Sequence, residues 1–180
     1  MSALIVAYRA IDRLNDVIGR GVSWLALFLV LVQFILVIMR YVFGVGSVMT
    51  QESLIYAHGV LFLMAAGYTL LHNGHVRVDI FYREAPPRRK AIIDLLGVLI
   101  LLLPFCYLIW YAAYPYVMNS WRVLEGSKET SGLPGIFLLK TVILVFVALV
   151  ALQGLSLALR SILVLSGRID PAEAEIEGGN

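Results

Sequence analysis

Four long stretches without an acidic or basic residue constrain this chain more than any other feature. They hold 19, 24, 27 and 19 residues and lie between Arg20 and Arg40, Glu52 and Arg77, Asp94 and Arg122, and Lys140 and Arg160. A helix needs about 20 apolar residues to cross a hydrocarbon core of about 30 Å. Because no water reaches the backbone there, each stretch must satisfy its own hydrogen bonds as a helix. The sequence therefore predicts an all-α integral membrane protein with four transmembrane helices.

The composition leaves little room for anything else. With 61% hydrophobic and 14% charged residues, the chain is excluded from the class of water-soluble globules. We expect one membrane domain over residues 21–165, with spans at about 21–43, 52–72, 91–118 and 134–163. Pro134 suits the first turn of the fourth span, and Pro104 is expected to kink the third. Residues 166–180 are acidic and are expected to form a flexible tail.

Residues 1–20 precede the first span and carry a helical pattern of their own. Apolar side chains recur at Leu4, Tyr8, Ile11, Leu14 and Ile18, whereas Arg9, Asp12, Arg13 and Asp16 fall on other faces. This pattern is typical of an amphipathic helix that lies in the membrane interface. A solvated helical tail is the alternative.

The basic residues predict the orientation. Ten of them lie in the N-terminal segment, the 73–90 connection and the C-terminal tail, and four lie on the other side of the membrane. Since basic residues are enriched in cytoplasmic loops, both termini are expected in the cytoplasm. Five aromatic residues gather at the opposite end of the third span, where amphipathic rings favour the interface: Trp110, Tyr111, Tyr114, Tyr116 and Trp121.

Signals of catalysis are missing from the sequence. It has no phosphate-binding loop, paired cysteines or metalloprotease motif, so we expect no enzyme activity, no cofactor and no metal site. His58 lies in the middle of a span and is expected to face another helix rather than lipid; a role in ion or proton movement is the alternative. No span centre holds a carboxylate, which argues against a self-sufficient carrier.

The fourth span carries a stripe of small residues every three or four positions. Its members are Ala148, Ala151, Gly154, Ala158 and Ser161. Small side chains let another helix approach closely, and Gln33 and Gln153 offer amide hydrogen bonds inside the membrane. The stripe predicts close helix packing, either with a partner protein or with the other helices of this chain.

The segment from Arg40 to Lys90 carries a set of short motifs. In order they are Arg40-Tyr41-Val42-Phe43, Glu52, Ala65-Ala66-Gly67-Tyr68 and His75-Val76-Arg77-Val78-Asp79. In this order and spacing, and with four spans, the chain resembles the DctQ-type small permease subunit of tripartite ATP-independent periplasmic (TRAP) transporters. Members often have a tryptophan and two acidic residues entering the second span, whereas this chain has Val48-Met49-Thr50-Gln51-Glu52.

The resemblance implies a non-catalytic subunit in a bacterial inner membrane. It would scaffold a large M-type membrane subunit in sodium-coupled symport of organic acids such as carboxylates or sialic acid, delivered by a periplasmic substrate-binding protein. The alternative is a self-contained or homo-oligomeric four-helix protein, such as an exporter or assembly factor.

Contacts with the partner or with lipid are expected at Arg40, Tyr41, Glu52, Tyr68, His75, Arg77, Asp79, Ala151, Gly154 and Ala158. Among them, Arg40 and Glu52 bracket a short turn and are expected to pair across it. His75 and Arg77 are placed to attract anionic phospholipids.

Overall fold

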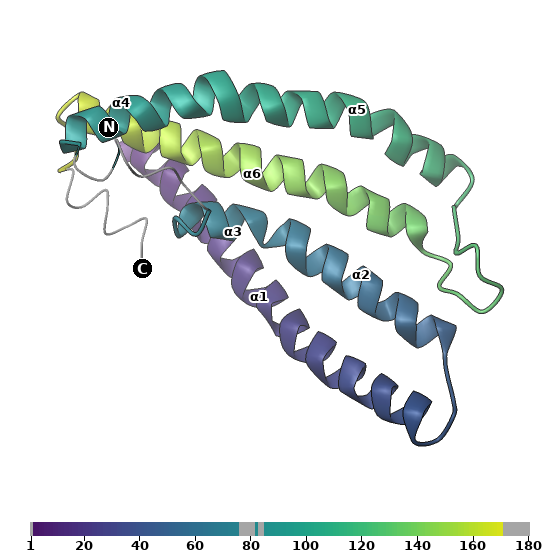
Figure 1. Ribbon diagram of the computed structural model, residues 1–180. Coiled ribbons are helices and arrows are strands. Elements are labelled where there is room, and N and C mark those ends of the chain that lie inside the picture. Colours follow the sequence, from purple (N-terminus) through teal and green to yellow (C-terminus); the bar gives the residue numbers. More distant parts are fainter. Residues whose placement is uncertain (1, 76–81, 83–84, 171–180) are drawn as a thin grey trace.

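The computed structural model describes residues 2–75, 82 and 85–170, and every regular element among these residues is a helix (Figure 1). The elements are α1 (Ser2–Tyr41), α2 (Val48–Met64), α3 (Ala66–Leu71), α4 (Pro87–Leu96), the π-helix η1 (Gly97–Leu102), α5 (Leu103–Arg122) and α6 (Ile136–Leu165). Joined end to end, they make four helices long and apolar enough to cross a membrane: Ala3–Tyr41, Val48–Leu71, Pro87–Arg122 and Ile136–Leu165. The predicted class, an all-α protein with four membrane-length helices, is confirmed.

α6 is the central helix of the bundle. It contacts α1, α2, α3, α4, η1 and α5. Of its most apolar window, 44% is buried inside the chain, against 6% for α1. Its residues Val147 and Val150 form a buried core with Cys106 of α5. The other helices therefore expose most of their apolar surface outward.

The helices fan out from one end of the bundle (Figure 1). We call this the terminal end; it holds the N-terminus, α4 and the last turns of α6. The opposite end, which we call the loop end, holds the 42–47 and 123–135 connections. Figure 1 shows α1 and α5 furthest apart there, with α2 and α6 between them.

The N-terminal segment is not a separate element. α1 continues without a break from Ser2 to Tyr41, so the boundary predicted near residue 20 is no helix end. Tyr8 is 2% exposed, but Leu4 and Leu14 of the predicted apolar face are 40% and 45% exposed. Asp12, which was expected on another face, instead bonds to α6. Placement of residues 1–20 in the membrane interface stays a prediction.

The proline predictions have different outcomes. The π-helix η1 ends at Leu102, two residues before Pro104, and the Leu103 N–H donates to the Val98 carbonyl five residues back. Proline lacks an N–H and disturbs the preceding turn, which accounts for a non-α turn here. Pro134 does not open the fourth span, because α6 begins at Ile136 after the N-cap residue Gly135.

Candidate functional site: two polar clamps and an exposed helix face

A buried polar cluster joins α1 to α6, and we call it the terminal clamp. The Asp12 carboxylate accepts hydrogen bonds from Arg160 Nη2 at 2.6 Å, Ser156 Oγ at 2.6 Å and Gln153 Nε2 at 2.8 Å. Asn15 Nδ2 donates to Gln153 Oε1 at 2.9 Å. Gln153, Ser156 and Arg160 lie at helical spacing on one face of α6, so the cluster runs along both helices.

The terminal clamp is almost fully removed from solvent. The side chains of Arg160 and Asp12 are 10% and 14% exposed, and Asn15 and Ser156 are buried. A charge buried in this way is tolerated when it is paired and hydrogen-bonded. The backbone approaches closely at this point, because a Cβ added to Gly67 of α3 would lie 2.1 Å from Asn15 Oδ1. A side chain at position 67 would therefore have to displace the Asn15 amide.

A second cluster, the loop clamp, surrounds the Glu52 carboxylate near the start of α2. Ser127 Oγ donates to Glu52 Oε1, and the Leu133 N–H donates to Glu52 Oε2 at 2.5 Å. A Cβ added to Gly132 would lie 2.6 Å from Glu52 Oε2, so the 123–135 connection wraps tightly around this carboxylate. Glu52 thus binds the other connection and not Arg40, and the expected pair between these two residues is not formed.

Lys140 of α6 reaches back to the same connection. Its ammonium binds the Glu125 carboxylate and lies 4.0 Å from the centroid of the Tyr116 ring. The hydrogen bond and the positive charge of Lys140 hold the pKa of the Glu125 carboxyl below its ordinary value of 4.5. Side chains of two helices, Glu52 of α2 and Lys140 of α6, therefore bind the 123–135 connection.

The predicted contact residues of the 40–79 segment lie in different surroundings. Arg40 and Tyr41 are exposed at the end of α1, with Tyr41 82% exposed. Tyr68 packs inside the chain, where its ring would meet any Cβ on Gly19 and lies 4.2 Å from the His72 ring. His75 is exposed, and its Nε2 lies 3.3 Å from the Ala66 carbonyl oxygen. Arg77 and Asp79 lie outside the described residues.

The small-residue stripe of the fourth span packs within this chain. A Cβ added to Gly154 would lie only 2.5 Å from the Leu102 side chain of η1. Ala158 is 6% exposed, and Ala151 packs against the core around Cys106. The stripe therefore packs against other helices of this chain, which is one of its two predicted alternatives.

Two polar side chains face outward from the spans. Both His58 of α2 and Gln33 of α1 are exposed on the surface of the chain. His58 stacks on Phe62, with ring centroids 6.3 Å apart. Within this chain His58 is exposed, and the prediction that it faces another helix stays a prediction. A polar group at this depth is costly against lipid, so it marks a surface that a protein partner can cover.

Sequence reasoning missed the terminal clamp. Asp12 and Arg160 were counted as charges flanking the membrane, and their pairing across 148 positions leaves no periodic signal. One signal was present: Gln153, Ser156 and Arg160 recur at helical spacing in an otherwise apolar span. A polar face on a buried helix predicts a polar partner.

Comparison with known protein families supplies the functional class. The family described as "Tripartite ATP-independent periplasmic transporters, DctQ component" matches residues 29–163, which is more than half of the chain. No curated protein and no solved structure matches in the corresponding comparisons. The matched range contains α2 to α5, nearly all of α6 and the last third of α1, so it includes the loop clamp and the exposed His58.

Proposed function

The chain belongs to the DctQ component family of TRAP transporters, and from this premise we propose that it is a rigid frame for the large subunit of a sodium-coupled organic acid transporter. The family makes it a non-catalytic small membrane subunit in the bacterial inner membrane. Its partners are the large M-type subunit and a substrate-binding protein. The scaffold role, the sodium coupling and the organic acid substrate are the proposed parts.

The observation that carries the scaffold role is the use of polar groups within the helices. In the terminal clamp, Asp12, Gln153 and Arg160 bond to one another instead of lining a path for ions. In the loop clamp, Glu52 is occupied by Ser127 and Leu133. The described residues contain no group of three or more histidine, cysteine or acidic side chains that could hold a metal ion. These features support a frame fixed at both ends, with transport carried by the partner.

We assign contact with the large subunit to the outward face of α1 and α2. This face holds Gln33, Arg40 and Tyr41 and the exposed His58. A hollow of about 390 Å³ lies between the two helices and is lined by Gln33, Arg40, Gln51 and apolar neighbours. A partner helix that fills the hollow would offer hydrogen-bond partners to these amides, each worth about 0.6–2 kcal/mol in a membrane.

Photo-crosslinking tests this face. A benzophenone amino acid at position 58 is expected to crosslink to the large subunit. The matched control is the same group at position 107, because Tyr107 is exposed on α5, which lies across α6 from α2 (Figure 1). Crosslinking at 107 but not at 58 would move the interface to the other face.

Uptake by the reconstituted three-part system tests the scaffold role. Organic acid uptake on an inward sodium gradient is expected to require this subunit. His58→Ala and Glu52→Gln should lower the amount of assembled transporter and leave the sodium ions moved per substrate unchanged. A changed sodium stoichiometry would mean that this subunit contributes to the ion path, and the proposal that it is only a frame would be wrong.

We propose that both termini lie in the cytoplasm, because ten basic residues lie on the side of the termini and four lie on the other side. A cysteine at Pro86, beside the terminal end, should be protected from an impermeant thiol reagent added outside. A cysteine at Gly126, in the loop-end connection, should react. The reverse labelling pattern would show that both termini lie on the outer side of the membrane.

A further inference from the structure

The hollow between α1 and α2 at the loop end presents a cation without an anionic partner in the described part of the chain. Its polar lining residues are Gln33, Arg40 and Gln51, and none of the described residues that line it is acidic. Arg40 is exposed, and no described side chain forms a hydrogen bond or an ion pair with its guanidinium. The side-chain amides of Gln33 and Gln51 also have no partner among these residues.

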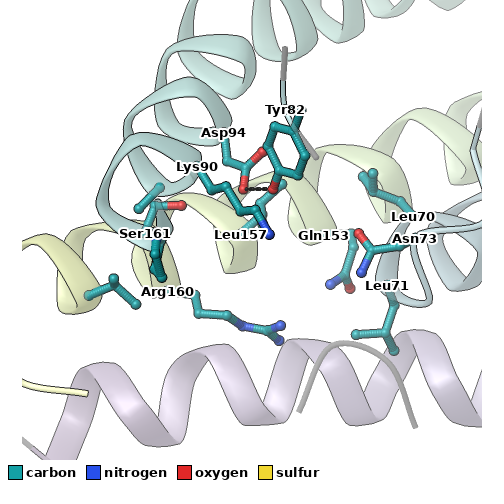
Figure 2. A pocket seen from close by; sticks show the side chains of 13 residues that line it. Leu70, Leu71, Asn73, Tyr82, Lys90, Asp94, Gln153, Leu157, Arg160 and Ser161 are labelled. Carbon is teal, nitrogen blue, oxygen red and sulfur yellow. Dashed lines mark hydrogen bonds between the residues drawn. The ribbon is translucent and has the colours of Figure 1, made fainter. Parts of the chain in front are cut away.

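The cavity between α4 and α6 differs in this respect. It has a volume of about 100 Å³ and contains its own carboxylate, because Asp94 lines it and accepts a hydrogen bond from the Tyr82 hydroxyl at 2.7 Å (Figure 2). Arg160, which lines the same cavity, is paired with Asp12. That cavity therefore holds acid and base together, whereas the hollow beside Arg40 must receive an anion from another molecule.

Glu52 does not supply this anion, although it follows Gln51 directly. Successive residues of a helix point about 100° apart, so the two side chains leave α2 in different directions. The Glu52 carboxylate binds Ser127 and the Leu133 N–H of the 123–135 connection. Its charge is therefore used within this chain, away from the Arg40 guanidinium.

The exposed polar side chains of α1 and α2 form two levels. Gln33 lies seven residues before Arg40 on α1, and His58 lies seven residues after Gln51 on α2. Seven residues make about two turns, so the members of each pair share a helix face about 10 Å apart. The 42–47 connection joins α1 to α2 as antiparallel neighbours (Figure 1). Arg40 and Gln51 therefore lie at an outer level, and Gln33 and His58 lie at an inner one.

We propose that this face binds a helix of the large subunit that places an aspartate or glutamate against Arg40. The same helix carries a hydrogen-bonding side chain seven positions away, at the level of Gln33 and His58. A guanidinium binds a carboxylate through two parallel charge-assisted hydrogen bonds, which fixes the partner helix in register. The inference rests on the proposed contact with the large subunit and adds the chemistry that the partner helix must present.

The depth of the polar groups favours a protein helix over a phospholipid. A lipid phosphate at the membrane surface can pair with Arg40. An acyl chain, however, offers no hydrogen bond to Gln33 or His58 about two turns deeper, where an unsatisfied polar group is costly. A helix with polar side chains at the same seven-residue spacing satisfies both levels, and its apolar side chains fill the hollow between them. The apolar lining residues available for that packing are Leu36, Val37, Leu54 and Ile55.

Carbodiimide coupling of the complex, purified in mild detergent, identifies the group that faces Arg40. Arg40→Lys places a primary amine there, and carbodiimide joins an amine to a carboxylate in direct contact as an amide, with loss of water. Arg122→Lys is the matched control, because Arg122 is also exposed in the last turn of a helix at the loop end, but on α5. Peptide mass spectrometry is expected to find an amide from position 40 to an aspartate or glutamate in a membrane helix of the large subunit. None is expected from position 122.

The affinity of the full-length chain for the large subunit gives a second measurement. Arg40→Gln should raise the apparent Kd about 30-fold or more, as when one member of a buried charge pair is removed. Arg122→Gln should leave it unchanged. Arg40→Glu, combined with a lysine in place of the coupled acid of the large subunit, should restore part of the affinity. Thermal unfolding of the isolated Arg40→Gln subunit should match the wild type, since no described side chain binds Arg40.

Unchanged affinity of Arg40→Gln, or coupling at both positions 40 and 122, would overturn the proposal. A phospholipid that native mass spectrometry finds on the wild type and not on Arg40→Gln, with the large subunit still bound, would assign the hollow to lipid instead. The photo-crosslink from position 58 separates this result from the frame proposal. Crosslinking at 58 without coupling at 40 would keep the large subunit on this face and reject the carboxylate. Absence of both reactions would reject the face as well.

Discussion

The two ends of the bundle are held together by different means. At the terminal end, α1 and α6 share a buried ion pair and amide cluster around Asp12 and Arg160. At the loop end, Glu52 and Lys140 bind a surface connection, and α1 is largely exposed, with Leu36 the buried residue of its 21–41 half. The contrast indicates that this chain determines its own structure at the terminal end. At the loop end it leaves more of its apolar helix surface exposed.

Removing Asp12 should have the largest effect. Asp12→Ala leaves Arg160 buried without its carboxylate, and breaking a buried pair in this way costs about 3–5 kcal/mol. Thermal unfolding of the purified subunit measures it. The matched control is Asp16→Ala, because Asp16 is more exposed than Asp12 and its partners are the exposed Arg20 and, at 3.3 Å, His72. Surface ion pairs of this kind contribute about 0–1 kcal/mol each.

The double variant Asp12→Leu with Arg160→Met sharpens this result. Replacing a whole buried pair by apolar side chains is often neutral or stabilising. Near wild-type stability in the double variant and loss in the single one would assign the cost to the unpaired charge. Equal stability of Asp12→Ala and Asp16→Ala would show that the buried pair contributes no more than the more exposed one.

Glu52→Ala should have the next largest effect. It removes the acceptor for Ser127 and the Leu133 N–H, and hydrogen bonds to a charged group contribute about 1.5–3 kcal/mol each. Hydrogen exchange of the 123–135 connection should rise, while exchange near Asp12 stays as in the wild type. A rise at both ends would show that the clamps act as one cooperative unit.

Larger side chains on the small-residue stripe should lower the free energy of unfolding somewhat less. Gly154→Leu, alone or with Ala151→Leu, forces side chains into Leu102, and overpacking commonly costs 1–3 kcal/mol. Because this packing is internal, the isolated subunit should lose stability together with the assembled complex. Gly21→Ala is the control, since a Cβ there meets no atom within 4 Å. If the isolated variant kept its stability but failed to assemble with the large subunit, the stripe would instead be part of the interface with that subunit.

Acid should produce the smallest change, confined to the loop end. The pKa of Glu125 is lowered in the folded chain, so its pairing with Lys140 stabilises the fold above its ordinary pKa of 4.5. That contribution is lost as the pH falls through the lowered value. Glu125→Gln should lower the unfolding temperature slightly at neutral pH, where the wild-type pair is formed, and should flatten its dependence on pH below 4.5. If the unfolding temperature of the variant still fell with acid as in the wild type, other carboxyl groups would be responsible for the pH dependence.

The sequence predicted the spans well because a bilayer imposes one simple requirement, a long run without charge. It predicted the contacts less well, because charges near a span end have several possible partners. Glu52 was expected to meet Arg40 across a short turn and instead meets the distant Ser127 and Leu133. Asp12 was read as an interfacial charge because nothing local indicates that α6 offers Arg160 to it. These choices depend on how helices cross, which a single sequence does not encode in its periodicity.

The π-helix η1 sets the rotational phase between the two halves of the third span. A π turn holds one more residue than an α turn, and each residue of an α-helix advances the side chains by about 100°. Deleting one residue within Gly97–Leu102 would restore a regular helix and turn α4 by that angle relative to α5. Lys90 and Asp94 would then point away from α6 while Cys106 kept its place in the core. A single-residue insertion or deletion at this point is therefore the shortest evolutionary step by which this chain could gain or lose the cavity that Lys90, Asp94 and Gln153 line between α4 and α6.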